Sequence, residues 1–304
     1  MKEEKEEIFM YNYDIYTDST SDLTNELREK YGLRYVPMNV VVNDNELVAN
    51  LDWVEFSAKE FYNWMREGKR TFTNQVPTHV FEEHFKSSLE KGKDVLYLGC
   101  SSALSGSINI AHTVAKELME EYPGRKVICV DTLRATFAEG ILAIKSAMLR
   151  EEGYSIEENA DWINEHKLES NLVCTVETLS YLKNAGRVKA TTAFFGNILG
   201  VKPMLIEDAL GNNFAVKKIK GRRASLLELI NMMKETIVDP ENQVIYLEHA
   251  DSEIDCEFVR EHIIDAFNPK EVYVSYVGPI IGSTTGPGTI IVSYFGKKVE
   301  IKGE

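Results

Sequence analysis

The sequence predicts an α/β protein of two domains. A length of 304 residues suits two domains of roughly 150 residues each. In the first half, short apolar runs alternate with helical segments, which is typical of βαβ units and a mostly parallel sheet flanked by helices. In the second half, two runs around the tight turn at 208–212 indicate an antiparallel hairpin, and therefore an α+β domain with a mixed sheet. We expect a disordered or tag-like lead at 1–12, an N-terminal domain at 13–168 and a C-terminal domain at 169–304.

Strands are expected where apolar or alternating runs have strand length, as at 95–98. The predicted strands are 13–17, 33–43, 95–98 and 126–130 in the first half, and 172–176, 202–207, 214–220, 244–248, 272–277 and 289–295 in the second.

Helices are expected where caps precede amphipathic runs. Ser57 with Glu60, and Ser155 with Glu158, form capping boxes, and Gly32 ends a helix as a C′ residue does. The predicted helices are 23–31, 57–68, 77–92, 108–122, 140–150, 155–166, 178–184, 191–199, 226–237 and 252–267.

Composition excludes several classes of function. A net charge of −14 argues against nucleic acid and against an anionic membrane surface as partners. No apolar run reaches the ~18 residues that a membrane span needs, and the charged N-terminus lacks the apolar core of a signal peptide. The four scattered cysteines fit reduced thiols without a zinc site. We therefore expect a cytoplasmic protein without metal or stable membrane insertion.

Three polar turns mark one edge of the predicted parallel sheet, at 18–22, 71–77 and 100–107. In such sheets ligands bind outside the carboxyl ends of the strands. The last turn enters the helix at 108–122, whose first backbone N–H groups favour an anion, and Gly106 permits close approach. An anion site is one interpretation, and simple helix capping by serine is the other.

Two further features have both a structural and a functional interpretation. The first is the Gly- and Thr-rich segment at 282–288. It is interpreted structurally as a turn that requires glycines, or functionally as a loop whose N–H groups and hydroxyls are available to a ligand. Basic residues also cluster in this acidic chain. The cluster is interpreted either as a solvated surface or as a docking patch for a partner or for phosphate. They are Lys217, Lys218, Lys220, Arg222 and Arg223, with Lys183, Arg187 and Lys189 as a second group.

Motifs for catalysis and nucleotide binding are missing from the sequence. No G-x-G-x-x-G follows a strand, no P-loop occurs, and no spacing suggests a metal. Ser105 lacks the leading glycine of a G-x-S-x-G elbow, and His249, at a strand end, is the one histidine kept as a candidate base. The acidic residues are interpreted as solvated helix faces. We therefore assign no catalytic residue and no cofactor.

Five motifs in order resemble the DegV family, bacterial fatty-acid-binding proteins that include the FakB subunits of fatty acid kinase. The resemblance extends over residues 13–295. The motifs are D-S-T-S-D-L at 18–23, T-N-Q at 73–75, S-S-A-L-S-G-S at 101–107, N-A-G-R-V at 184–188, and G-P-I-I-G with T-G-P-G at 278–282 and 285–288.

The resemblance implies a long-chain fatty acid held in an apolar tunnel between the two domains. In the family the carboxylate is bound by residues that match Thr73 and Ser105, and a histidine before T-G-x-G assists; here Asn74 and Thr284 stand in place of the family's serine and histidine. The positions implied for the carboxylate site are Thr73, Ser102, Ser105, Gly106, Thr284 and Thr285. Those implied for docking of a dihydroxyacetone-kinase-like fatty acid kinase are Arg187, Lys220, Arg222 and Arg223.

The leading hypothesis is a non-enzymatic carrier that presents the fatty-acid carboxylate to the kinase for phosphorylation. The first alternative is an acyl hydrolase or transferase that uses Ser105, which requires a base within hydrogen-bond reach. The second is a carrier of a different amphiphile, because Thr284 cannot carry the positive charge of a histidine.

Overall fold

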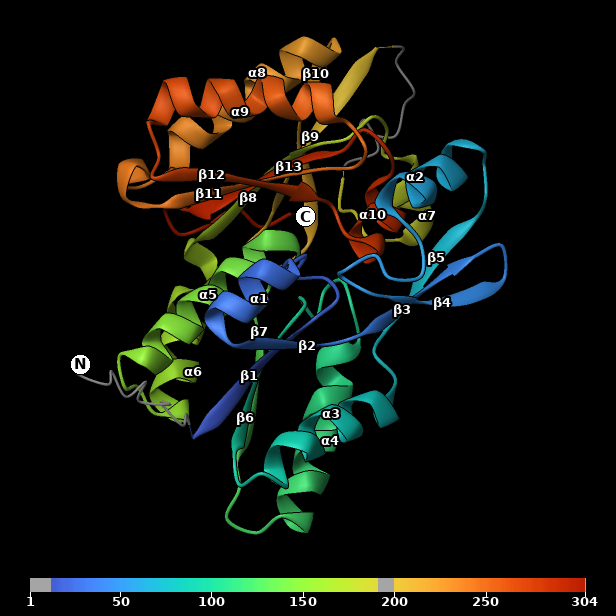
Figure 1. Ribbon diagram of the computed structural model, residues 1–304. Coiled ribbons are helices and arrows are strands. Elements are labelled where there is room, and N and C mark those ends of the chain that lie inside the picture. The colour runs from blue at the N-terminus through green and yellow to red at the C-terminus, as the bar shows by residue number, and fades with distance from the viewer. Residues whose placement is uncertain (1–11, 191–199, 304) are drawn as a thin grey trace, which may run out of the picture.

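The computed structural model describes residues 12–190 and 200–303 (Figure 1). Residues 1–11 of the expected lead and the helix expected at 191–199 lie outside this part of the chain. Within it the strands form three sheets, of four, six and three strands. All strands of the four-stranded sheet precede residue 168, and all strands of the six-stranded sheet follow it. The boundary expected between 168 and 169 stays a prediction.

The four-stranded sheet is parallel, as predicted, with the order β2-β1-β6-β7. Its residues alternate between two cores: Val95 and Tyr97 pack with α3 and α4, whereas Leu96 and Leu98 pack with α1, α5 and α6. Helices therefore cover both faces, as a parallel sheet requires. The elements are β1 Tyr13–Asp18, α1 Asn25–Tyr31, β2 Leu33–Val36, α3 Thr78–Leu89, β6 Asp94–Gly99, α4 Ser107–Glu121, β7 Val127–Asp131, α5 Thr136–Glu151 and α6 Ile156–His166.

A small antiparallel sheet corrects two predictions. The single strand expected at 33–43 is divided at Pro37, which has no N–H for a ladder, and its second part, β3 Met38–Val42, belongs to another sheet. There it pairs with β4 Asn45–Ala49 and with β5 Thr71–Asn74. The polar turn expected at 71–77 is therefore wrong in its first half, which is a strand. The helix α2 Ala58–Arg66 follows β4 and begins with the predicted capping box.

The six-stranded sheet is mixed, in the order β10-β9-β8-β13-β11-β12. The predicted hairpin is confirmed, because β9 Val201–Glu207 and β10 Asn213–Lys220 pair antiparallel. Helices α8 Arg222–Thr236 and α9 Glu253–Phe267 pack on one face through a core of their own (Figure 1). The remaining strands are β8 Ser170–Thr175, β11 Val244–His249, β12 Glu271–Tyr276 and β13 Ile290–Phe295, and the short helices are η1 Lys167–Glu169, α7 Ser180–Ala185, η3 Pro240–Asn242 and α10 Pro279–Thr285.

The helix α10 corrects the loop expected at 282–288. Pro279 is its first residue, where a missing N–H costs nothing, and Gly286, at φ +86°, ends it. Its stability comes from burial of Ile280 and Ile281 in the core that also holds α2. The segment is therefore helical from 279 to 285 and turns only at its end.

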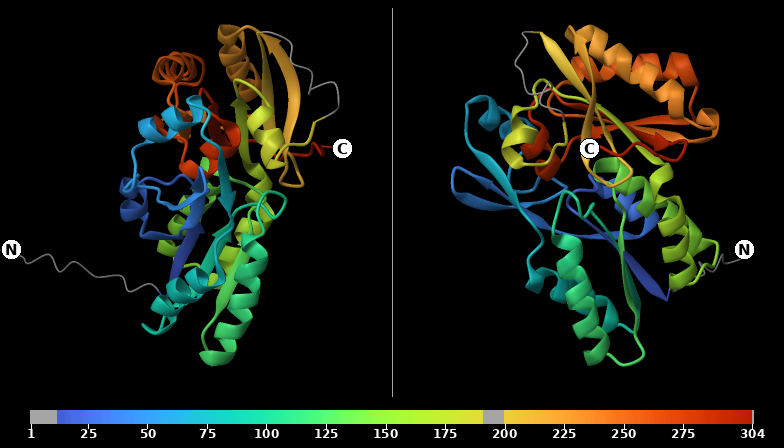
Figure 2. Two further views of the ribbon diagram at one scale, coloured as in Figure 1. Left: turned by 90° about the vertical axis from the view of Figure 1, so that its right-hand side faces the viewer. Right: turned by 180° about the vertical axis from the view of Figure 1, so that it is seen from behind.

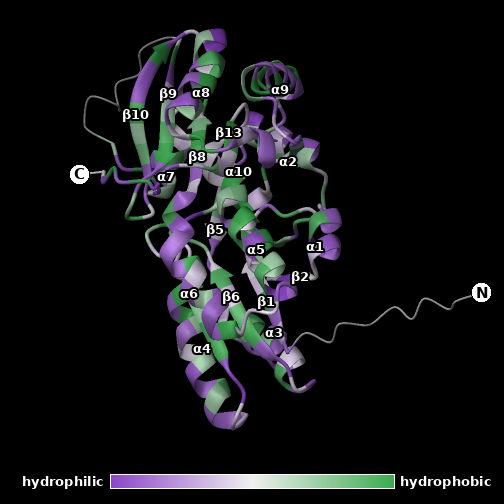
Figure 3. Ribbon diagram, turned by 90° about the vertical axis from the view of Figure 1, so that its left-hand side faces the viewer, coloured by the Kyte–Doolittle hydropathy of each residue, from purple (hydrophilic) through white to green (hydrophobic). Residues whose placement is uncertain are grey.

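The two larger sheets lie end to end, with α5 between them (Figure 2). The helices at the outside carry both hydrophilic and hydrophobic residues along their length (Figure 3). The face of the six-stranded sheet opposite α8 and α9 is turned toward the carboxyl ends of the parallel strands. Among the described residues, no helix is long and apolar enough to cross a membrane.

Candidate functional site

A cavity of about 480 Å³ lies between the two larger sheets, where the three predicted polar turns meet. Thr20 comes from the turn after β1, Thr73 from the end of β5, and Ser105 from the turn after β6. The turns after β1 and β6 lie at the carboxyl ends of parallel strands, as expected, whereas the segment at 71–74 reaches the cavity as a strand of the small antiparallel sheet. The opposite wall is mainly apolar and comes from the six-stranded sheet and from α10. Its residues are Leu172, Cys174, Leu205, Ile280, Ile281 and Ile291.

The turn around Ser105 both caps a helix and lines the cavity. The Ser105 Oγ accepts a hydrogen bond from the backbone N–H of Ser107, at 3.2 Å, and lies 2.9 Å from the Ser107 Oγ. A Cβ on Gly106 would lie 2.2 Å from Oε1 of Gln75, so a larger residue would require that the Gln75 side chain move. The two interpretations of the serine turn are therefore compatible at Ser105.

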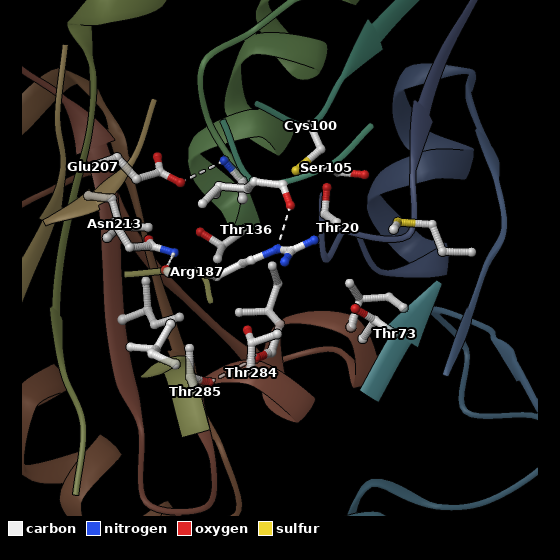
Figure 4. A pocket seen from close by; sticks show the side chains of 18 of the residues that line it. Thr20, Thr73, Cys100, Ser105, Thr136, Arg187, Glu207, Asn213, Thr284 and Thr285 are labelled. Atoms are coloured by element: carbon white, nitrogen blue, oxygen red, sulfur yellow. Dashed lines mark hydrogen bonds between the residues drawn. The ribbon is translucent and has the colours of Figure 1, made fainter. Parts of the chain in front are cut away.

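Thr73 stands across the cavity from the serine turn and presents a hydroxyl that bonds to no other described residue (Figure 4). A second cavity of about 440 Å³ lies outside the first and shares Thr73, Arg187 and Thr284 with it. Lys69 and Arg70 also line this outer cavity. The hydroxyl of Thr73 is therefore at the passage between an inner apolar space and an outer basic one.

Thr284 and Thr285 of α10 also line the inner cavity, but their hydroxyls are engaged. Thr284 Oγ1 donates to the carbonyl of Ile281 at 2.9 Å, and Thr285 Oγ1 donates to the same carbonyl at 3.0 Å. We call Thr73, Ser105, Thr284 and Thr285 the hydroxyl rim. Ser102, a further expected carboxylate contact, is exposed and does not line the cavity.

Arg187 lines both cavities, a position that the sequence did not reveal (Figure 4). It follows Gly186, which ends α7 at φ +68° and turns the chain toward the serine turn. The guanidinium donates from Nε to the carbonyl of Leu104 at 2.8 Å and from NH1 to that of Ala185 at 2.7 Å. Among the described residues no carboxylate is paired with it.

The other residues expected for docking lie outside both cavities. Arg222 donates to Asp255 at 2.8 Å, and the guanidinium of Arg223 lies 4.1 Å from the centre of the Phe258 ring. Lys220 is exposed at the end of β10. Arg187 is therefore the member of the predicted docking set that lies beside the cavity.

Behind Thr20 the cavity has a floor of buried acids. Thr20 Oγ1 lies 2.6 Å both from Oδ1 of Asp18 and from Oε2 of Glu139. The hydroxyl of Thr20 therefore bridges the two carboxyls. Complete burial, followed by the charge of Asp18, raises the pKa of Glu139 well above the usual range.

A second buried pair joins the turn after β1 to β11. Burial raises the pKa of Asp22 to about 7, and burial followed by the charge of Asp22 raises the pKa of Glu248 well above its usual range. A charged Asp22 therefore disfavours the ionised form of Glu248. Burial also raises the pKa of Glu207 to about 8; its Oε1 accepts from the N–H of Ala135 at 2.8 Å.

We call Asp18, Asp22, Glu139, Glu207 and Glu248 the buried carboxyls. The prediction that acidic residues occupy solvated helix faces is wrong for all five, since none exceeds 5% exposure. Their proton occupancy depends on burial, which no local pattern reveals.

The six histidines lie in the described part of the chain, and none lines the cavity. His249, the candidate base, is buried, and its Nδ1 accepts from the N–H of Ser252 at 3.2 Å. Burial lowers its pKa. Across the described residues there is no group of three His, Cys, Asp or Glu side chains that could hold a metal.

The fold and the cavity define a class: an α/β protein whose parallel and mixed sheets enclose a cavity with an apolar wall and a hydroxyl rim. The chain belongs to the DegV family of uncharacterised proteins, whose family model matches residues 12–297. A DegV domain-containing protein of Clostridium perfringens is 35% identical over 294 residues, which cover 96% of this chain and 100% of the relative.

Solved structures of this family share the fold. A DegV lipid binding protein of Thermotoga maritima has a TM-score of 0.84 at 26% identity, over 95% of this chain and 100% of that one. A DegV family protein of Thermus thermophilus, described by its fatty acid binding, has a TM-score of 0.84 at 29% identity, over 93% and 99% of the two chains.

Proposed function

We propose that this protein is a carrier that binds one long-chain fatty acid in the cavity, with the carboxylate at the hydroxyl rim. The observation that carries the proposal is an apolar wall combined with two hydroxyls at the cavity. The hydroxyl of Thr73 bonds to no other described residue, and that of Ser105 has the Ser107 hydroxyl as its side-chain partner. The family membership and the fatty-acid binding of the Thermus thermophilus relative support it.

Physical chemistry fixes the orientation of such a ligand. Each buried CH₂ contributes about 0.8 kcal/mol, so the chain belongs against the apolar wall. A carboxylate that leaves water needs charge-assisted hydrogen bonds to offset its desolvation. The hydroxyl rim and Arg187 offer donors and positive charge, whereas the space behind Thr20 is filled by buried carboxyl groups. The head group therefore belongs on the side of Thr73 and Arg187.

We also propose that the carboxylate is presented to a dihydroxyacetone-kinase-like partner through the outer cavity. Lys69, Arg70 and Arg187 line this space, and it opens beside Thr73. Basic side chains suit a partner that brings phosphate. Arg187→Ala should lower acyl phosphate formation by such a kinase with ATP while fatty-acid binding falls less; unchanged turnover would contradict this docking role.

The alternative of a serine-dependent hydrolase or transferase has less support. Ser105 has Ser107 as its side-chain partner among the described residues, and no histidine lines the cavity. A serine nucleophile requires a base within about 3 Å. We therefore favour a carrier without catalytic residues or cofactor.

Native mass spectrometry and lipid extraction of the purified protein test the proposal. A fatty acid at unit stoichiometry is expected, and protein consistently free of lipid would overturn it. A different extracted amphiphile would support the second alternative, in which Thr284 alters the head-group preference. Ser105→Ala combined with Thr73→Ala should reduce loading at least tenfold, by loss of two hydrogen bonds to a charged group.

Ser102→Ala is the matched control, because this serine belongs to the same turn but is exposed and does not line the cavity. Its loading should equal that of the wild type. Equal loading of the double variant and the control would reject the assignment of the carboxylate to Thr73 and Ser105.

A further inference from the structure

Ser107, the first residue of α4, is fully buried behind the hydroxyl rim and does not line the cavity. Its Oγ accepts from the backbone N–H of Val76 at 3.1 Å and lies 2.9 Å from the Oγ of Ser105. Its own N–H donates to the Ser105 Oγ at 3.2 Å. These are the hydrogen bonds that Ser107 forms with described residues other than those within its helix.

The direction of the bond between the hydroxyls of Ser105 and Ser107 follows because each buried hydroxyl hydrogen needs an acceptor. The hydrogen of Ser107 is buried, and Ser105 Oγ is the acceptor available to it among the described residues. If Ser105 were the donor, the Ser107 hydrogen would be left without an acceptor in a site closed to water, which is unfavourable. Ser107 therefore donates to Ser105.

Ser105 then has both acceptor positions filled, one by the N–H and one by the O–H of Ser107. Its own hydrogen has no described acceptor and is left for the cavity, whose lining includes Ser105. A hydroxyl in this state donates to a ligand and cannot accept from it. It favours a head group with strong acceptor oxygens, such as a carboxylate.

We infer that Ser107 is a positioning residue that makes Ser105 a donor and thereby sets the preference of the cavity for carboxylates. This inference rests on the proposed function. The bonds from Val76 to Ser107 and from Ser107 to Ser105 form a continuous chain, and each bond polarises the next. Val76 follows Thr73 by three residues, so the same chain ties the segment after β5 to the start of α4.

The test measures the affinities for hexadecanoic acid and 1-hexadecanol in four proteins: wild type, Ser105→Ala, Ser107→Ala and Ser107→Thr. The ratio of the acid affinity to the alcohol affinity reports the head group alone, because the two probes share one tail. We expect Ser105→Ala and Ser107→Ala each to lower this ratio by about tenfold, since bonds to charged groups are the stronger ones. Ser107→Thr retains the hydroxyl and should keep the ratio within about twofold of the wild type.

A structural role alone would weaken acid and alcohol binding alike. Equal losses for the two probes in Ser107→Ala, which leave the ratio unchanged, would overturn the inference. A ratio in Ser107→Thr as low as in Ser107→Ala would overturn it as well. Retained alcohol binding shows that the variant folds. A wild type that binds neither probe contradicts the proposed function itself, whereas a wild type that prefers the acid and a Ser107→Ala variant with the same preference contradict only the role of Ser107.

Discussion

The hydroxyl rim and the buried carboxyls are two polar regions of the same cavity, and they differ in where their hydrogens go. At the rim, the hydroxyl hydrogens of Thr73 and Ser105 have no acceptor among the described residues and are left for a ligand in the cavity. In the floor, the hydroxyl of Thr20 lies 2.6 Å from an oxygen of Asp18 and from an oxygen of Glu139, so its hydrogen already has an acceptor within the fold.

This difference separates binding from stability. A polar group with an unused donor forms a new stabilising bond when a ligand arrives, whereas replacing a fully buried group that is bonded within the fold removes stabilising contacts. Substitutions at the rim should therefore change affinity with little effect on folding. Substitutions in the floor should do the reverse.

The largest effect is expected at Arg134, which is fully buried beside the floor. It donates to the carbonyls of Ser170 at 2.6 Å and Asp208 at 3.1 Å, and its Nε lies 3.9 Å from Oε2 of Glu207. Arg134→Ala should lower the free energy of unfolding by about 3–5 kcal/mol, because it leaves buried acceptors without a partner. Urea denaturation measures this loss.

Arg125→Ala is the control for charge, since Arg125 lies at the surface end of the parallel sheet, with its side chain 35% exposed. It should change the free energy of unfolding by less than about 1 kcal/mol. If the two variants were equally stable, the floor would not be the stabilising region.

A second effect is the pH dependence of stability that Glu207 introduces. Its pKa is about 8 in the folded protein, above the ordinary value of 4.5, so the folded state binds more protons between these values. Stability then falls as pH rises from about 5 to 8, by about 1.4 kcal/mol for each pKa unit at most.

Glu207→Gln is neutral in both states and keeps an oxygen for the N–H of Ala135. The variant should gain stability relative to the wild type as pH rises toward about 8, the folded pKa of Glu207. Urea denaturation at a series of pH values measures the difference between the two proteins. A constant difference across the range would show that Glu207 is not protonated in the fold.

Local sequence was enough to predict the parts of the fold that depend on local chemistry. The capping boxes at Ser57 and Ser155 are confirmed because both partners lie within one helical turn. The polar segment at 71–74 is a strand because β3 pairs with it, and that partner lies about thirty residues away. The Gly- and Thr-rich α10 is helical because Ile280 and Ile281 are buried in a distant core.

The candidate site divides in the same way. Thr73 and Ser105 were found through ordered motifs and lie at the cavity. The positions of Arg187 and of the buried carboxyls depend on how separate elements pack, so the sequence revealed neither. Arg187 was expected in a docking patch, from the family resemblance and from charge, and the carboxyls were expected on solvated faces.

A third effect belongs to the rim. Thr73→Val removes the hydroxyl and keeps the branched shape, so fatty-acid affinity should fall about five- to tenfold, as for one hydrogen bond to a charged group. The thermal midpoint should stay the same, because this hydroxyl bonds to no other described residue. Titration with hexadecanoic acid and a melting curve measure the two quantities. Lost stability with retained affinity would contradict the division between rim and floor.

The smallest effect is expected when charge is added to the rim at Thr284. This side chain lines both cavities and donates to Ile281 within its own helix, so its removal leaves no other described group without a partner. Thr284→His adds an imidazole with an ordinary pKa of about 6.5. Below about pH 6 the ring is positively charged and should tighten fatty-acid binding roughly three- to tenfold, whereas above about pH 8 it should have little effect. Titrations at both pH values, with the wild type as control, separate this gain from any general effect of pH on the ligand. The same gain at both values would mean that the ring acts by shape, and no gain at either would place the carboxylate away from α10.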